Sequence, residues 1–155
     1  MKSIIKILFL ATIAIALVSC GDDDDSGTKP SDMEFGQVTT TINGESWDVE
    51  DGIYLNTTKS VRAEKTTGDL TEIINVSMQV EGDLVTGTYT AVCYYRSMEN
   101  EGDLKSWNDL EGSAEVTEVN DDEISGTFSF TGENNDGTEK KVTGSFKVER
   151  SWTGI

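Results

Sequence analysis

The side chains in this chain that could do chemistry are carboxylates, one internal thiol and a few aromatic rings. The sequence holds 29 Asp and Glu residues, 12 Lys and Arg residues and no histidine. The absence of histidine excludes nucleophiles activated by a Ser-His or Cys-His pair, and every zinc site that contains histidine. Paired carboxylates, which hydrolyse glycosides when they lie about 5 to 10 Å apart, remain as an alternative. With so many acids, chance pairs are inevitable, so we predict no enzyme activity.

Two acidic segments contain residue types that bind cations, and both are better explained as turns. Placing Gly137 at the sixth position of an EF-hand loop puts Gly132 first and Thr143 twelfth, so the required carboxylates are missing at both ends. The segment Asn120-Asp121-Asp122-Glu123 is likewise typical of a turn, with a weak cation site as the alternative. We therefore predict no metal and no cofactor.

Four aromatic residues are candidates for ligand binding: Tyr54, Tyr94, Trp107 and Trp152. Exposed rings on a β-surface can stack on sugars. Trp107 lies in the polar stretch 98–109, which is either a long loop or a loosely paired strand, and loops on a rigid scaffold often carry binding residues. The alternative is that these rings cover the sheet or close its ends.

The first 19 residues have the three regions of a secretory signal. A start with two lysines is followed by an apolar run over residues 7–18, which is shorter than the roughly 20 residues of a membrane-spanning helix. Leu17-Val18-Ser19-Cys20 resembles the lipobox of bacterial lipoproteins. This resemblance implies that the chain is cut before Cys20 and that lipid on Cys20 holds the protein to a membrane.

Residues 20–34 are expected to form an acidic, flexible tether. Asp22 to Asp25 are four adjacent carboxylates, which repel one another and must stay solvated. Such a run directly after the lipidated cysteine resembles the surface-export signal of Bacteroidota lipoproteins. We therefore expect an outer-membrane lipoprotein that faces the cell exterior, with a plain spacer and a periplasmic face as the alternative. Residues 35–151 are expected to form a single domain.

The net charge limits the classes of partner that the chain can bind, and the cysteine content limits its disulfide and thiol chemistry. The net charge of −17 disfavours nucleic acid, because a phosphate backbone is bound by clustered Lys and Arg. After lipidation of Cys20, Cys93 is the one cysteine left, so the processed chain has no intramolecular disulfide. Cys93 lies in an apolar stretch, and we predict a small buried core residue and not a nucleophile.

Alternation of apolar and polar residues with a period of two recurs along the chain and predicts strands. Asn43-Gly44 is typical of a two-residue hairpin turn. Such a turn places Thr40 opposite Trp47 and Val38 opposite Val49. One face of this hairpin is then mainly apolar and the other is polar, as a half-buried hairpin requires.

The C-terminal hairpin allows a sharper test of register. A three-residue loop, Asn135-Asp136-Gly137 with the glycine in the left-handed conformation, brings the apolar faces of both strands together. This register pairs Phe128 with Gly144 and Gly126 with Phe146, so that each ring lies over a glycine of the neighbouring strand. We expect these glycines to make room for rings and not for a ligand.

Further strands are predicted between the two hairpins, for a total of about eight in up-and-down order. Antiparallel strands with one solvated face must curl or stack to bury the other face. We therefore predict an all-β domain, built as an antiparallel β-sandwich or an open barrel. The predicted strands lie at residues 52–56, 60–65, 74–80, 89–95 and 114–119.

Three segments together resemble a family of small Bacteroidota lipoproteins that is catalogued as a domain of unknown function. They are the hairpin 38–47, the strand entry Gly87-Thr88-Tyr89 and the closing hairpin 124–146. The resemblance covers most of residues 35–149. It implies the same fold and the same location, and it implies no active site.

These patterns favour a membrane-anchored, non-enzymatic domain that binds a protein, a glycan or a small apolar ligand outside the cell. A structural envelope component without a ligand of its own is an alternative from a different class.

Overall fold

The computed structural model describes residues 28–100 and 102–151, and these form an all-β structure. Within this part of the chain, one short 3₁₀ turn precedes nine strands. The elements are η1 (Pro30–Asp32), β1 (Gln37–Ile42), β2 (Glu45–Val49), β3 (Ile53–Leu55), β4 (Ser60–Thr67), β5 (Leu70–Met78), β6 (Gly87–Glu99), β7 (Asp103–Val119), β8 (Glu123–Glu133) and β9 (Glu139–Ser151).

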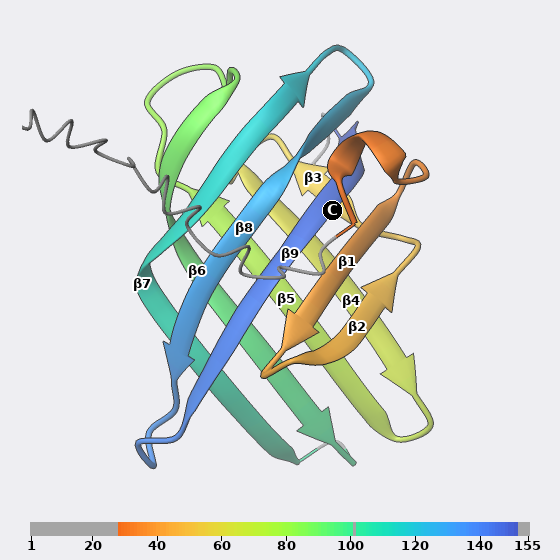
Figure 1. The fold of residues 1–155 in the computed structure, drawn as a ribbon. Helices are drawn as coiled ribbons and strands as arrows, with labels where there is room; N and C mark the ends of the chain where they lie inside the picture. Colours follow the sequence, from red (N-terminus) through yellow and green to blue (C-terminus); the bar gives the residue numbers. More distant parts are fainter. Residues whose placement is uncertain (1–27, 101, 152–155) are drawn as a thin grey trace, which may run out of the picture.

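Strands β3 to β9 close into a barrel, because β9 pairs with β8 on one side and with β3 on the other (Figure 1). The β1–β2 hairpin lies outside this ring of strands. It pairs with residues 142–147 of β9, whereas β3 pairs with residues 149–151. The prediction of an all-β domain is therefore confirmed, although the barrel is closed and not open.

The predicted up-and-down order fails at one place, where β3 pairs parallel with β9. Strands β2 and β3 run in the same direction, because residues 50–52 between them step sideways without reversing the chain. Gly52 makes this step possible. A Cβ atom on Gly52 would lie 2.4 Å from Cγ2 of Val38 and 2.9 Å from Cγ1 of Val148, so only glycine fits between them.

Both predicted hairpins are confirmed in their turns and their register. Asn43 and Gly44 have positive φ angles of 52° and 85°, as a tight hairpin turn requires, and Gly137 has a φ of 81°. Phe128 pairs with Gly144, and a Cβ atom on Gly144 would lie 2.7 Å from Cζ of the Phe128 ring. These glycines thus make room for rings, as predicted.

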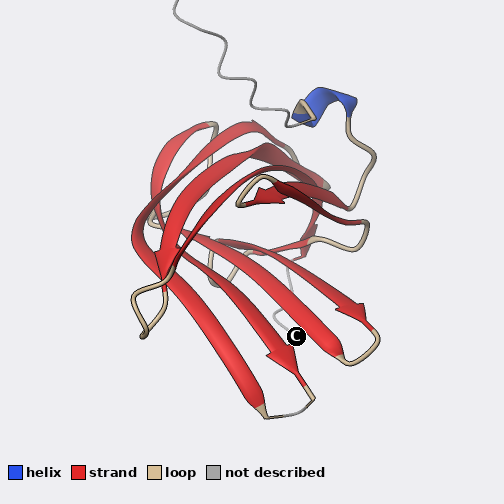
Figure 2. Cartoon of the chain, turned by 60° about the horizontal axis from the view of Figure 1, so that its bottom comes forward, coloured by secondary structure: helices blue, strands red, loops and turns tan. Residues whose placement is uncertain are grey.

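The interior of the barrel is filled by side chains and is closed at both ends. The strands curve round this interior, and η1 lies outside it (Figure 2). At one end, Leu84 of the loop 79–86 is buried against the core. The other end is covered by Trp47, Tyr95 and Trp107, all of which are buried.

Candidate functional site

The aromatic candidates do not form a shared exposed surface. Trp107 lies within β7, opposite Tyr95 of β6, and is only 7% exposed, while Tyr54 on β3 is fully buried. The expectation of exposed rings is therefore wrong for Trp107 and Tyr54. The stretch 98–109 is a paired hairpin and not a loop, because β6 and β7 continue their ladder through it.

Tyr94 lies on the opposite face of β6 from Tyr95 and is half-buried. The Arg96 guanidinium lies 4.1 Å from the centre of its ring, so one face of the ring is already covered. Tyr94 is therefore separated from Trp107 by the thickness of the sheet. Trp152 lies outside the described residues.

Three buried rings, Trp47, Tyr95 and Trp107, form what we term the aromatic layer at one end of the barrel. Trp47 Nε1 donates a hydrogen bond of 3.0 Å to the Glu72 carboxylate, and the Tyr95 hydroxyl donates to the other oxygen of the same group. The ring centres of Tyr95 and Trp107 lie 5.3 Å apart. Lys140 Nζ lies 4.7 Å from the Trp107 ring and 5.2 Å from the Tyr95 ring.

The aromatic layer connects the β1–β2 hairpin to the end of the closed barrel. Strand β2 forms a backbone ladder with β1 alone, and the Trp47–Glu72 hydrogen bond ties it to β5. Burial, together with the hydrogen bond to Glu72, raises the pKa of the Tyr95 hydroxyl, which keeps it protonated as a donor. Because its polar atoms are paired, the layer serves as a structural closure.

The most distinctive surface is a groove of about 430 Å³ on the outer face of β1, β2, β6, β7, β8 and β9. Its side chains form two rows that cross these strands, with each member paired with the next on the neighbouring strand. The first row consists of Asp48, Thr39, Ser145, Thr127, Glu115 and Thr88, each paired with the next. The second row consists of Ser46, Thr41, Thr143, Ser129 and Ser113.

The groove is long and narrow. Neighbouring strands lie about 4.8 Å apart, so the first row extends roughly 24 Å along the sheet. The two rows are two residues apart along each strand, which is a separation of roughly 7 Å. Thr28, Lys29 and Pro30 line the groove as well, just before η1, which packs against β8 and β9.

The hydroxyl groups of the groove residues differ in how they are used. Thr41 and Thr143 bond to each other at 2.8 Å. Thr39 Oγ1 is buried without a hydrogen-bond partner among the described residues, and it is too deep for a molecule in the groove to reach. Ser145, its neighbour in the first row, is only 4% exposed and lines the groove. Each hydroxyl group that reaches the groove can donate and accept a hydrogen bond.

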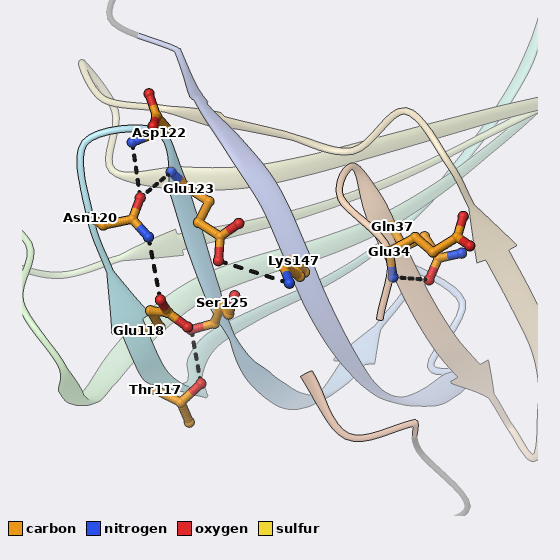
Figure 3. Close-up of polar contacts among 9 residues, drawn as sticks. All are labelled: Glu34, Gln37, Thr117, Glu118, Asn120, Asp122, Glu123, Ser125 and Lys147. Carbon is orange, nitrogen blue, oxygen red and sulfur yellow. Dashed lines mark hydrogen bonds and ion pairs between the residues drawn. The ribbon is translucent and has the colours of Figure 1, made fainter. Parts of the chain in front are cut away.

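The acidic turns behave as predicted from the sequence. At the β7–β8 turn, the Asn120 side-chain oxygen accepts hydrogen bonds from the backbone N–H groups of Asp122 at 2.9 Å and of Glu123 at 2.8 Å (Figure 3). The Asp136 carboxylate accepts two hydrogen bonds from Thr138, which lower the pKa of Asp136. These side chains are used to shape turns. Among residues 28–100 and 102–151, no group of three or more His, Cys, Asp and Glu side chains is arranged to hold a metal ion.

Cys93 is a buried core residue, as predicted, and its thiol lies near Gly112 of β7. A Cβ atom on Gly112 would lie 2.7 Å from the Cys93 sulfur. Burial raises the pKa of Cys93 to about 12, with a further contribution from the charge of Asp109. A thiol this basic stays protonated at neutral pH and is not a nucleophile.

Sequence reasoning identified the polar faces of both hairpins but missed that they lie side by side. The signal was present in the alternating Thr and Ser residues of β1, β8 and β9. No helix in the described part of the chain is long and apolar enough to cross a membrane. Comparison with known protein families, with curated proteins and with solved structures finds no match.

Proposed function

We propose that this chain is a lipid-anchored outer-membrane protein that faces the cell exterior and binds a ligand without catalysing a reaction. The observation that carries the binding part is the hydroxyl-lined groove, with its two rows of side chains paired across neighbouring strands. The anchor rests on the sequence pattern that ends at Cys20. The acidic run after Cys20 supports the exterior location.

The length of the tether supports a link between the anchor and the groove. Thr28, which lines the groove, comes eight residues after Cys20. Eight residues span at most about 28 Å when fully extended. Lipid on Cys20 would therefore hold the groove within that distance of the membrane surface, where it can meet envelope or extracellular material.

The geometry of the groove does not suit a glycoside hydrolase. Its two carboxylates, Asp48 and Glu115, belong to strands β2 and β7, which are four strand spacings apart in the first row. This corresponds to about 19 Å along the sheet, about twice the largest separation that inverting enzymes use. The aromatic layer, by contrast, favours the alternative of a structural component, because it stabilises the fold without needing a ligand.

The proposed location is tested with cells that carry the wild-type protein or Cys20→Ala. The wild-type protein should take up a fatty-acid label and sediment with membranes, and the Cys20→Ala protein should be unlabelled and either released or left as a precursor. Protease treatment of intact cells should then remove the wild-type protein while a periplasmic control survives. Labelling that persists in Cys20→Ala would overturn the anchor, and protection from protease would overturn the exterior location.

A further inference from the structure

The groove has the dimensions of a site for a chain and not for a compact molecule. It is roughly 24 Å long across the strands and roughly 7 Å wide between its two rows. Residues from β2 at one extreme and β6 at the other line the same groove. A ligand that uses its whole length must therefore be extended and must run across the strands.

The chemistry of the groove selects the kind of chain. Nine of the side chains in the two rows carry hydroxyl groups, each of which can both donate and accept a hydrogen bond. The backbone groups of β1, β8 and β9 are already engaged in ladders on both sides, so an added peptide strand has no free edge to pair with here. A polyhydroxylated chain matches this surface better than a peptide does.

Charge decides between neutral and acidic chains. The first row carries Asp48 at one end and Glu115 near the other, while the second row is uncharged. The whole chain has a net charge of −17, and among the described residues Lys29 is the only cation that lines the groove. An anionic chain would therefore be repelled over most of its length.

We propose that the groove binds a neutral glycan chain laid across β1, β9, β8 and β7, parallel to the two rows. This inference rests on the proposed binding function and names its ligand class. Ser145 of β9 and Thr127 of β8 are neighbours at the middle of the first row. Hydroxyl groups of the glycan form hydrogen bonds with the side-chain hydroxyl groups of the two rows.

The test uses the full mature lipoprotein in a detergent without a sugar headgroup. Its binding to neutral oligosaccharides of glucose, xylose and mannose, from disaccharide to hexasaccharide, is measured by calorimetry. The affinity should increase with chain length and level off once the chain spans the groove. Thr127→Val, which removes one hydroxyl at nearly constant shape, should weaken the binding of the longest ligand by about fivefold to tenfold.

Thr131→Val is the matched control, because Thr131 is on the same strand and the same face but does not line the groove. The Thr131→Val variant should bind the longest oligosaccharide with the affinity of the wild-type protein. Melting curves should show that both variants are folded. Equal weakening by both variants, tighter binding of acidic than of neutral chains, or no saturable binding would overturn the inference. If glycan binding fails while the wild-type protein still takes up the fatty-acid label, the glycan inference is overturned and the lipid anchor is supported. The two outcomes are therefore distinguishable.

Discussion

Truncation of Phe128 to alanine tests the register on which the barrel wall depends. The Phe128 ring is 3% exposed and lies over Gly144 of β9. It also stacks between two other rings, with centres 6.4 Å from Phe130 and 6.5 Å from Phe146. Because Gly144 has no side chain, the residue directly opposite Phe128 on β9 cannot fill the space that the ring leaves.

The expected loss of stability follows from this packing. Replacing a buried Phe by Ala usually costs about 3 to 5 kcal/mol, because transfer energy is lost and a cavity remains. The missing side chain at Gly144 places Phe128→Ala in the upper part of that range. At roughly 4 °C per kcal/mol for a domain of this size, the melting temperature should fall by about 15 to 20 °C.

The measurement is thermal and urea unfolding followed by circular dichroism, with Ser129→Ala as the control. Ser129 is the next residue of β8, points to the outer face and is exposed, so its truncation should change stability by less than about 0.5 kcal/mol. If Phe128→Ala melted within a few degrees of Ser129→Ala, the ring would not be part of the core. The argument for aromatic rings over strand glycines would then fail.

Two further predictions concern the aromatic layer and the buried thiol and tyrosine hydroxyl groups. The Trp47→Phe variant should lose about 1 to 2 kcal/mol of stability, because the hydrogen bond to Glu72 is missing. Amide hydrogen exchange should then increase in β1 and β2 more than in β8, and an equal increase in all strands would contradict the proposed closure. Burial raises the pKa values of Cys93 and Tyr54 to about 12 and also raises that of Tyr95. The folded state therefore keeps protons that the unfolded chain releases, so stability should fall as the pH rises above about 8.5, by up to about 1.4 kcal/mol per pH unit for each group. The Cys93→Ala variant should lack the decrease in stability between about pH 8.5 and 10. If its stability depended on pH as that of the wild-type protein does, the contribution assigned to the Cys93 thiol would be refuted.

Local pairing in this fold was predictable because turns fix it. The Asn43-Gly44 turn determines which residues of β1 and β2 face each other, and the left-handed Gly137 does the same for β8 and β9. The parallel pairing of β3 was not predictable from period or turn type. It depends on the tight fit of Gly52 between Val38 and Val148, which are distant in sequence from each other.

The groove was missed for a related reason. Each hairpin shows its polar face in the sequence, but the groove exists only because β1 pairs with β9, where Thr39 meets Ser145. No turn connects these strands, so no local signal specifies their register. The aromatic candidates failed differently, since a Trp in a polar stretch such as Trp107 can point inward when its strand alternates.

The position of β9 in the chain determines when the barrel can close. Of the nine described strands, β9 is the last in the chain, and β8, β1 and β3 all pair with it. Until it is available, the barrel wall stays open and β1 lacks its long-range partner about a hundred residues away, as in the Thr41–Thr143 contact. Such non-local pairing is slow to form. The barrel wall and the β1–β2 hairpin are therefore expected to become ordered together, once β9 is in place between β8, β1 and β3.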